Sequence, residues 1–223
     1  MTEYIFRGIE LLPGSVRPKQ LFILLHGVGT NSSDMVPLAN QLRTVYPDAA
    51  FLIPEGTFPF DGGGEGRQWF SLSGLTEENS PARITEAMQP LFTLVRHAQD
   101  RLTVLPPDTA LVGFSQGAMM ALEFSAAHDG RVGRVLAFSG RYAKLPEKAP
   151  ELTTVHLFHG ENDNIIPVEH AYEAYERLLE LQGDVTVDIA PSVGHGIDAS
   201  LAGSAIHRLQ TCVPLRSWKQ ALV

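Results

Sequence analysis

Hydrophobic residues follow two patterns along the chain, short continuous runs and longer helical repeats. Short apolar runs bounded by Gly, Pro or polar residues are typical of strands buried on both faces of a sheet. We expect strands at residues 4–11, 21–25, 50–53, 110–114, 134–138, 154–158 and 185–189, the first as an antiparallel edge. Runs of this kind alternating with helices predict an α/β fold, with a mostly parallel central sheet and helices on both faces.

Helical spacing of apolar residues appears in four segments between and after these runs. It predicts helices over 35–45, from Ser80-Pro81 through residue 95, over 171–181 before Gly183, and over 197–209. A further strong helix-forming segment follows residue 117. With 223 residues and 44% hydrophobic content, the chain can bury one sizeable core, so we expect a single domain spanning 1–223.

Residues 55–75 fit neither pattern, because glycines alternate there with the aromatics Phe58, Phe60, Trp69 and Phe70. A long ordered loop of this kind favours a functional role, and the aromatic residues suit the wall of an apolar pocket. Trp69 and Phe70 are the candidate substrate-pocket residues. A surface excursion is the alternative. A phosphate cradle is excluded because no Gly-Lys-Ser/Thr follows the glycines.

Charge and cysteine content narrow the choice of partners and compartment. The formal net charge of −8 disfavours binding to a nucleic acid backbone. Cys212, the only cysteine, forms no internal disulfide, which fits a reducing compartment, and we interpret it as a small buried residue rather than a reactive thiol. The amino terminus lacks the pattern of a signal peptide, and no run approaches the roughly 20 apolar residues of a membrane helix. We therefore expect a cytoplasmic protein.

A candidate nucleophile lies in Gly113-Phe114-Ser115-Gln116-Gly117, between an apolar run and a helix-forming segment. A serine on a sharp strand-to-helix turn has an exposed Oγ, and glycines two residues to either side let strand and helix pack closely. The helix N-terminus there favours developing negative charge. At the Gly and Ser frequencies of this chain, the motif would arise by chance in roughly one chain in ten of this length, so alone it is weak evidence. The flanking elements and the partners below strengthen it. A structural turn serine is the alternative.

A serine nucleophile needs a base and an acid, which in α/β-hydrolases follow it in the order Asp or Glu, then His. The loop after the run 154–158 offers Asp163, with Glu161 as the rival acid nearer the strand end. The loop after 185–189 holds His195 between two glycines, which allow an exposed ring. Asp163 is the favoured acid and His195 the favoured base.

The turn after the second strand, His26-Gly27-Val28-Gly29, is where an oxyanion donor belongs. We expect the backbone N–H groups of Val28 and Gln116 to form the oxyanion hole, an ordinary strand-to-helix turn being the alternative for Val28. The other histidines do not indicate a metal site, since His156 and His159, three residues apart on a strand, face opposite ways. No metal and no cofactor is expected.

These residues together resemble the phospholipase/carboxylesterase family of α/β-hydrolases, which includes bacterial carboxylesterases and acyl-protein thioesterases. The resemblance spans nearly the whole chain and rests on five motifs: His26-Gly27-Val28-Gly29, Arg67-Gln68-Trp69-Phe70, Gly113-Phe114-Ser115-Gln116-Gly117-Ala118, His159-Gly160 with Asp163 and Pro167, and Gly194-His195. In detail the chain is most similar to uncharacterised enterobacterial esterases that share His-Gly-Val-Gly and Gly-Arg-Gln-Trp-Phe.

The resemblance implies the α/β-hydrolase fold, the triad Ser115, Asp163 and His195, and both oxyanion donors. Two residues depart from the family pattern: Val28 stands where leucine is usual, and Ser71 where many members have aspartate. Both departures affect the expected acyl pocket rather than the triad.

The expected function is hydrolysis of carboxylic esters of small or acyl-chain substrates through an acyl-serine intermediate, without a cofactor. Cleavage of acyl-protein thioesters or of lysophospholipids by the same triad is the enzymatic alternative. A noncatalytic α/β-hydrolase that only binds a ligand is the alternative from another class. A small ester or acyl compound is the expected partner, with no nucleic acid and no stable membrane insertion, and the sequence leaves the oligomeric state open.

Overall fold

The computed structural model describes residues 6–14, 16–76, 78–214 and 216–217. Its main sheet has seven strands in the order β1-β3-β2-β6-β7-β8-β9, with β1 antiparallel to β3 and the other neighbours parallel. The strands are β1 (Gly8–Leu11), β2 (Leu21–Leu25), β3 (Ala50–Pro54), β6 (Thr109–Phe114), β7 (Arg134–Phe138), β8 (Thr154–Gly160) and β9 (Val185–Ala190). The expected α/β architecture and its antiparallel edge are confirmed.

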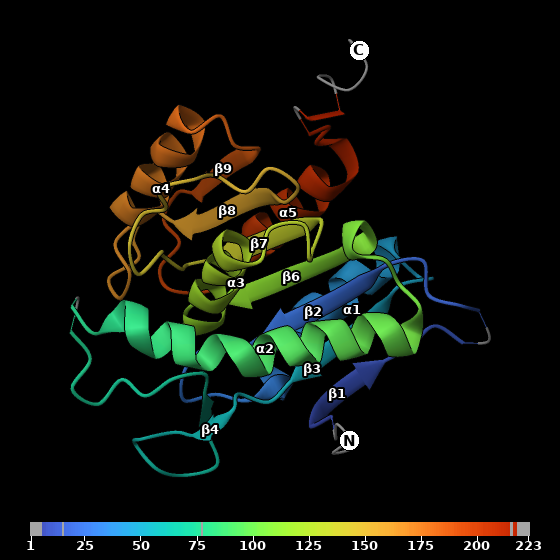
Figure 1. Ribbon diagram of the computed structural model, residues 1–223, viewed down its shortest axis with the longest axis horizontal. Coiled ribbons are helices and arrows are strands. Elements are labelled where there is room, and N and C mark those ends of the chain that lie inside the picture. Colours follow the sequence, from blue (N-terminus) through green and yellow to red (C-terminus); the bar gives the residue numbers. More distant parts are fainter. Residues whose placement is uncertain (1–5, 15, 77, 215, 218–223) are drawn as a thin grey trace.

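Helices cover both faces of this sheet (Figure 1). On one face lie α2 (Ser80–Leu102), α3 (Gln116–Ala127) and α4 (Glu169–Glu180), and on the other lie α1 (Val36–Val45) and α5 (Ala199–Thr211). Alternate residues of each strand enter different cores: in β2, Leu21 and Ile23 pack under α2 and α3, whereas Phe22 packs with α1. The continuous apolar runs follow from this burial on both faces.

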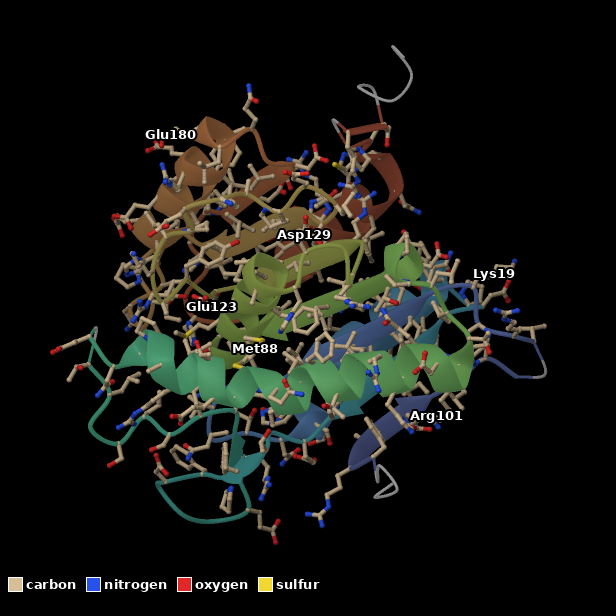
Figure 2. All side chains as sticks on the ribbon, in the orientation of Figure 1. Lys19, Met88, Arg101, Glu123, Asp129 and Glu180 are labelled. Atoms are coloured by element: carbon tan, nitrogen blue, oxygen red, sulfur yellow. The ribbon has the colours of Figure 1, made fainter. Side chains whose placement is uncertain are left out.

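The apolar and the charged residues of α2 lie on different sides of the helix, and this determines how it packs on the sheet. Met88 is buried and lies between α2 and the neighbouring helix α3, while Arg101, near the end of α2, extends to the surface and pairs with Glu10 of β1 (Figure 2). At the far periphery, Lys19 pairs with Asp48. Apolar residues at helical spacing thus seat the helix on the sheet, and charged residues face outward.

Residues 55–75 contain more regular structure than the sequence suggests. β4 (Phe58–Pro59) and β5 (Arg67–Gln68) pair as a two-stranded antiparallel sheet, and Thr30 forms a bridge with Arg67. Strands of two residues are too short to produce an alternating pattern. The glycine-rich stretch 62–65 between the two strands is exposed, whereas residues 68–70 are buried.

The expected first strand is also shorter than predicted. Strand β1 begins at Gly8, residues 4 and 5 lie outside the described residues, and Phe6 and Arg7 precede the strand. Within the described ranges, no helix has both the length and the apolar content needed to cross a bilayer.

Parallel strands bring their carboxyl ends to one edge of the sheet. The turns that follow β2, β6, β8 and β9 therefore lie along this edge, and each of them carries one of the residues selected from the sequence. The fold thereby gathers residues that lie far apart in the chain.

Candidate active site

Ser115 occupies a strained turn between β6 and α3. Its backbone φ is 53°, a left-handed value that is unfavourable for a residue with a side chain. Two hydrogen bonds hold the turn: the Ser115 N–H donates to the Phe138 carbonyl (2.9 Å), and the Ser115 carbonyl accepts the Met119 N–H (3.0 Å). The surrounding structure imposes this conformation, which presents the hydroxyl at the edge of the sheet.

The two glycines of the motif are required by close backbone contacts. A Cβ on Gly117 would lie 2.1 Å from the Leu25 carbonyl oxygen, and a Cβ on Gly113 would lie 2.3 Å from the Gly117 carbonyl oxygen. Since backbone cannot move aside as a flexible side chain can, only glycine fits at both positions. Close approach of α3 to β2 and β6 thus explains the spacing of the motif.

The side chains of Ser115, His195 and Asp163 form one continuous chain of hydrogen bonds. His195 Nε2 lies 3.0 Å from Ser115 Oγ, and His195 Nδ1 lies 2.8 Å from Asp163 Oδ2. The ring of Phe114 packs against the imidazole with centroids 5.0 Å apart, which restrains its orientation. Because the carboxylate can only accept, Nδ1 carries the proton and Nε2 is left to accept the serine hydroxyl proton.

The Asp163 side chain is held ionised in a buried position. Burial alone would raise its pKa, but hydrogen bonds from His195 and from the backbone N–H groups of Ile166 and Ile165 outweigh it, so the pKa lies below its ordinary value. Both N–H groups donate to Oδ1 at 2.9 Å. The rival acid, Glu161, is exposed, and its carboxylate makes no hydrogen bond within the described part of the chain.

The turn expected to hold the second oxyanion donor is anchored to β5. The Gly29 N–H donates to the Arg67 carbonyl (2.8 Å), and the Arg67 N–H donates to the Thr30 carbonyl (2.7 Å). Between these anchors and α3, the N–H groups of Val28 and Gln116 have no acceptor among the residues that the structure describes. Two donors are therefore available to bind a negatively charged oxygen.

His26 fixes the start of this turn without carrying charge. The Gly56 N–H donates to its Nε2 (2.9 Å), so the ring proton is on Nδ1, which lies 2.7 Å from the Gly27 carbonyl oxygen. Burial lowers the pKa of His26, because the fully enclosed ring cannot stabilise a proton by hydration. A neutral His26 thus joins the turn to the segment after β3.

The side chain of Gln116 links the nucleophile turn to the 55–75 segment, a role that the sequence does not indicate. Its Oε1 accepts the Trp69 N–H (2.8 Å), and its Nε2 donates to the Phe70 carbonyl (2.7 Å). The Trp69 indole N–H in turn donates to the His26 carbonyl (2.8 Å). Only the backbone N–H of Gln116 was expected to be functional, since amide side chains carry no pattern that reveals their partners.

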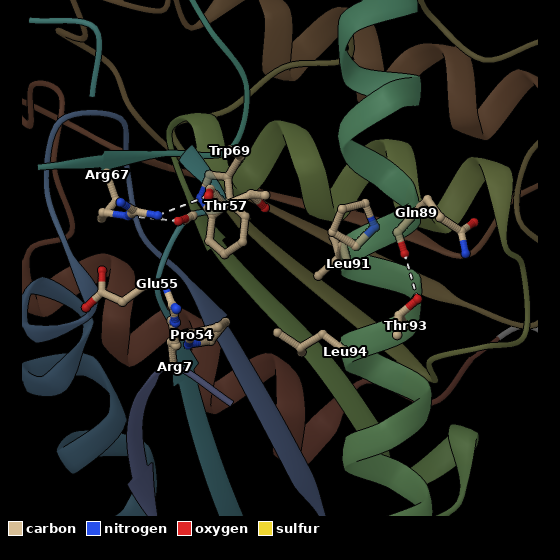
Figure 3. A pocket seen from close by; sticks show the side chains of 12 residues that line it. Arg7, Pro54, Glu55, Thr57, Arg67, Trp69, Gln89, Leu91, Thr93 and Leu94 are labelled. Atoms are coloured by element: carbon tan, nitrogen blue, oxygen red, sulfur yellow. Dashed lines mark hydrogen bonds between the residues drawn. The ribbon is translucent and has the colours of Figure 1, made fainter. Parts of the chain in front are cut away.

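Trp69 and Phe70, the expected pocket residues, are each only 2% exposed and belong to the core. Each nevertheless lines a cavity. Trp69 borders one of about 420 Å³, whose lining also includes Arg67, Thr57 and Leu94 of α2 (Figure 3). Phe70 borders another, of about 510 Å³, with Phe58 and Phe60. Phe58 in β4 and Phe60 after it are thus more exposed aromatic residues of the cavity wall than Phe70.

Phe60 connects the second cavity to the turn expected to hold an oxyanion donor. A Cβ on Gly29 would lie 3.4 Å from the Phe60 ring, so the ring packs directly on the turn that contains Val28. At the cavity wall, the Ser71 hydroxyl donates to Asp61 Oδ2 (2.6 Å). Ser71, one of the two expected departures from the family pattern, therefore hydrogen-bonds a carboxylate from position 61.

The remaining candidates have other environments. His156 Nδ1 lies 2.8 Å from Thr186 Oγ1, whereas His159 contacts the Asp163 loop, so the two histidines do not converge. Cys212 is half-buried rather than enclosed. In the described ranges, no three or more His, Cys, Asp or Glu side chains form a group that could hold a metal ion.

A mostly parallel sheet with a serine on a strand-to-helix turn, followed in the chain by the acid and the histidine at later strand ends, defines the α/β-hydrolase fold. Residues 8–213 match the phospholipase/carboxylesterase family, and the chain belongs to that family. The resemblance drawn from the sequence motifs is confirmed.

Relatives support the same assignment. The chain is 43% identical over 204 residues to esterase YpfH of Escherichia coli, which covers 92% of this chain and 88% of the relative. It is 25% identical over 184 residues to acyl-protein thioesterase 1 of Kluyveromyces lactis, covering 73% of this chain and 79% of the relative. The crystal structure of esterase PE8 matches with a TM-score of 0.83 at 29% identity, over 93% of this chain and 99% of that one.

The likeness of fold extends further than the likeness of sequence. The Bacillus cereus carboxylesterase matches with a TM-score of 0.77 at 18% identity, over 91% of this chain and 92% of that chain.

Proposed function

We propose that this protein, a hydrolase of carboxylic ester bonds, acts through a triad of Ser115, His195 and Asp163. The observation that carries the proposal is the unbroken hydrogen-bond chain from Ser115 Oγ through the His195 ring to the Asp163 carboxylate. Membership in a family of esterases makes acyl transfer the chemistry expected of this site. No step requires a metal or an organic cofactor.

In the first half-reaction, Ser115 Oγ attacks the ester carbonyl while His195 Nε2 takes the hydroxyl proton. Asp163 stabilises the resulting imidazolium, and the N–H groups of Val28 and Gln116 bind the oxyanion. Collapse of the tetrahedral intermediate breaks the ester C–O bond, and His195 gives its proton to the departing alcohol. The product of this step is an acyl-Ser115 enzyme.

In the second half-reaction, water replaces the alcohol. His195 Nε2 removes a proton from water, which attacks the acyl carbonyl, and the same two N–H groups bind the second oxyanion. Collapse releases the carboxylic acid, and His195 returns the proton to Ser115 Oγ. The His195 side chain is 17% exposed, so water can reach the ring from solvent.

The acyl group is proposed to occupy the cavity lined by Phe58, Phe60 and Phe70. Contact between Phe60 and Gly29 supports this, because it brings an apolar wall next to the turn that would bind the carbonyl oxygen. Aromatic walls favour an apolar acyl chain over a charged one. Phe70, selected from the sequence, is part of this proposed pocket, whereas Trp69 borders the other cavity.

Thioesters and lysophospholipids remain alternative substrates of the same site, and the thioesterase relative favours testing them. A series of p-nitrophenyl esters and matched acyl thioesters of increasing chain length, compared as kcat/KM, separates these choices. In Ser115→Ala, kcat should fall by about 10⁶ for every substrate. Absence of turnover in the wild type, combined with tight binding of the acyl compounds, would instead indicate a noncatalytic binding protein.

The proposed pocket is tested by Phe60→Ala, with Leu72→Ala as control. Leu72 is 40% exposed on the same segment and is not part of the cavity wall. Phe60→Ala should shift the preferred acyl length toward longer or bulkier chains, since it removes part of the wall, while Leu72→Ala should keep the wild-type profile. An unchanged profile in Phe60→Ala would place the acyl group elsewhere.

A cytoplasmic location and lack of affinity for nucleic acid stay predictions. Cell fractionation should recover the protein with cytoplasmic enzymes, and recovery from the medium or from membranes would contradict the first. The net charge of −8 should prevent retention on immobilised DNA at physiological salt. Retention there would contradict the second.

A further inference from the structure

Asp163 is contacted by two histidines rather than one. Besides His195 Nδ1 at 2.8 Å, His159 Nε2 lies 3.3 Å from the same carboxylate oxygen, Oδ2. His159 is on β8 and is 1% exposed, and its Nε2 also lies 2.7 Å from the Ile166 carbonyl oxygen. This histidine is not needed for the proton transfers of the triad.

The proton on His159 can be assigned from its partners. The Ile166 carbonyl, 2.7 Å from Nε2, can only accept a hydrogen bond, so Nε2 must carry a hydrogen and donate it. Burial lowers the pKa of His159, which favours the neutral ring. The titratable groups that act on this ring are Asp163, His195 from the loop after β9, and His170 near the start of α4. A neutral ring therefore donates its Nε2 hydrogen to the Ile166 carbonyl, and this polar N–H group lies beside the Asp163 carboxylate.

The Asp163 carboxylate is consequently surrounded by donors. Oδ1 accepts the N–H groups of Ile165 and Ile166, Oδ2 accepts from His195, and His159 Nε2 lies 3.3 Å from Oδ2 without a hydrogen bond to it. The bond from His159 to the Ile166 carbonyl also ties the end of β8 to the far side of the loop that carries Asp163. Free rotation of the carboxylate is thereby prevented.

We propose that His159 is a positioning residue for the triad, which holds Asp163 Oδ2 and its loop in line with His195 Nδ1. This inference rests on the proposed function, because it concerns the acid of the same triad. His159 thus acts through Asp163 and does not touch the substrate.

The test compares His159→Leu, which removes the donor, with His159→Gln, whose side-chain amide can restore an N–H near the position of Nε2. The matched control is His156→Leu, because His156 is equally buried on the same strand but has Thr186 and Arg134 as its partners. Each variant is assayed with the best p-nitrophenyl ester over the pH range of the wild type, and folding is checked by urea unfolding.

His159→Leu should lower kcat by about 10- to 100-fold with little change in KM, as expected when a reacting group is slightly misplaced. The acidic limb of its pH profile should move to lower pH, because a misplaced Asp163 stabilises the imidazolium less. The downfield NMR signal of the His195 Nδ1 proton should shift or broaden. His159→Gln should recover most of the rate, and His156→Leu should lose stability with neither the loss of kcat nor the shift of the pH limb.

Wild-type kinetics in His159→Leu, or equal losses in His159→Leu and His156→Leu, would overturn the proposal while leaving the triad intact. Failure of the wild type to turn over any ester would instead reject the proposed function. If His159→Leu does not fold, ¹⁵N–¹H spectra of the wild type decide: a neutral His159 with its proton on Nε2 at neutral pH supports the proposal, and a proton on Nδ1 alone contradicts it.

Discussion

Two acidic residues lie in the loop after β8, and their environments predict different effects of substitution. Asp163→Asn should lower kcat by about 10⁴, because an amide at this position favours the wrong tautomer of His195. Glu161→Gln should leave kcat within about twofold, as expected of an exposed side chain that makes no contact with the triad among the described residues. Steady-state kinetics of both variants on one ester check the assignment. A larger loss in Glu161→Gln would show that the acid is wrongly assigned.

His156 predicts a pH dependence of stability that is separate from catalysis. Burial, Arg134 and Arg208 lower the pKa of this ring to about 3, whereas it titrates near 6.5 in the unfolded chain. Above pH 6.5 the ring is neutral in both states, and the full free energy of unfolding is present. As pH falls from 6.5 toward 3, the unfolded chain binds a proton that the folded chain does not, so the free energy of unfolding decreases. Between pH 7.5 and pH 5.0, the contribution of His156 to the free energy of unfolding should fall by about 2 kcal/mol.

The comparison of wild type with His156→Leu isolates this contribution. The free energy of unfolding, measured in urea at both pH values, should fall by about 2 kcal/mol more in the wild type than in the variant. His26 and His159 also have lowered pKa values, but they contribute equally to both proteins. Equal pH dependence, or an NMR titration of His156 near pH 6.5, would contradict the prediction.

At this scale, the sequence indicates the reacting residues better than the residues that hold them. Ser115 and His195 stand next to glycines at strand ends, and that context is visible in the chain. Asp163 and Glu161 share one loop, so only the family resemblance separates them before the structure is known. His159 also precedes a glycine at a strand end and belongs to a family motif, but nothing in the chain indicates that the Ile166 carbonyl is the partner of its ring.

The turn between β6 and α3 predicts a severe effect of adding a single methyl group. Gly117→Ala would bring a Cβ within 2.1 Å of the Leu25 carbonyl oxygen, so α3 must move away from β2. The free energy of unfolding should fall by more than about 3 kcal/mol.

The matched control is Gly203→Ala, an exposed position in α5 where an added Cβ meets nothing within 4 Å. Alanine should stabilise this helix by about 0.5–1 kcal/mol relative to glycine. Urea unfolding of the two variants gives both values. Similar stabilities of Gly117→Ala and the wild type would mean that the turn is looser than the structure indicates.

Elements with long apolar patterns are predictable, and those built from tertiary contacts are not. Strands β2, β6 and β7 follow from continuous runs of Leu, Ile, Val and Phe that need burial on both faces. The pairing of β4 with β5 does not, since it depends on the bridge between Thr30 and Arg67 rather than on a local repeat. That bridge also anchors the turn that contains Val28.

On the scale of the whole molecule, one sheet with two buried faces favours a single cooperative unit. Each of the seven strands of the main sheet is hydrogen-bonded to its neighbours, and helices cover both faces. The expected single domain should therefore unfold in one transition, with circular dichroism and tryptophan fluorescence changing at the same urea concentration. Two separated transitions would contradict a single domain.

The order of the strands illustrates what the sequence leaves open at this scale. Alternation of strands and helices predicts a mostly parallel sheet, yet β3 lies between β1 and β2 while β6 lies on the other side of β2. Packing determines on which side of an existing strand each helical connection places the next strand, and local sequence patterns do not encode that side. The family resemblance implied the arrangement that the residues alone left undetermined.

Labelling with a fluorophosphonate probe tests most directly whether Ser115 is an activated nucleophile. Peptide mapping by mass spectrometry should locate one covalent adduct on Ser115 of the wild type, with slower labelling in Asp163→Asn and none in Ser115→Ala. Activation by the His195 and Asp163 chain of hydrogen bonds is the physical reason. An unlabelled wild type, or an adduct on any other residue, would contradict the account.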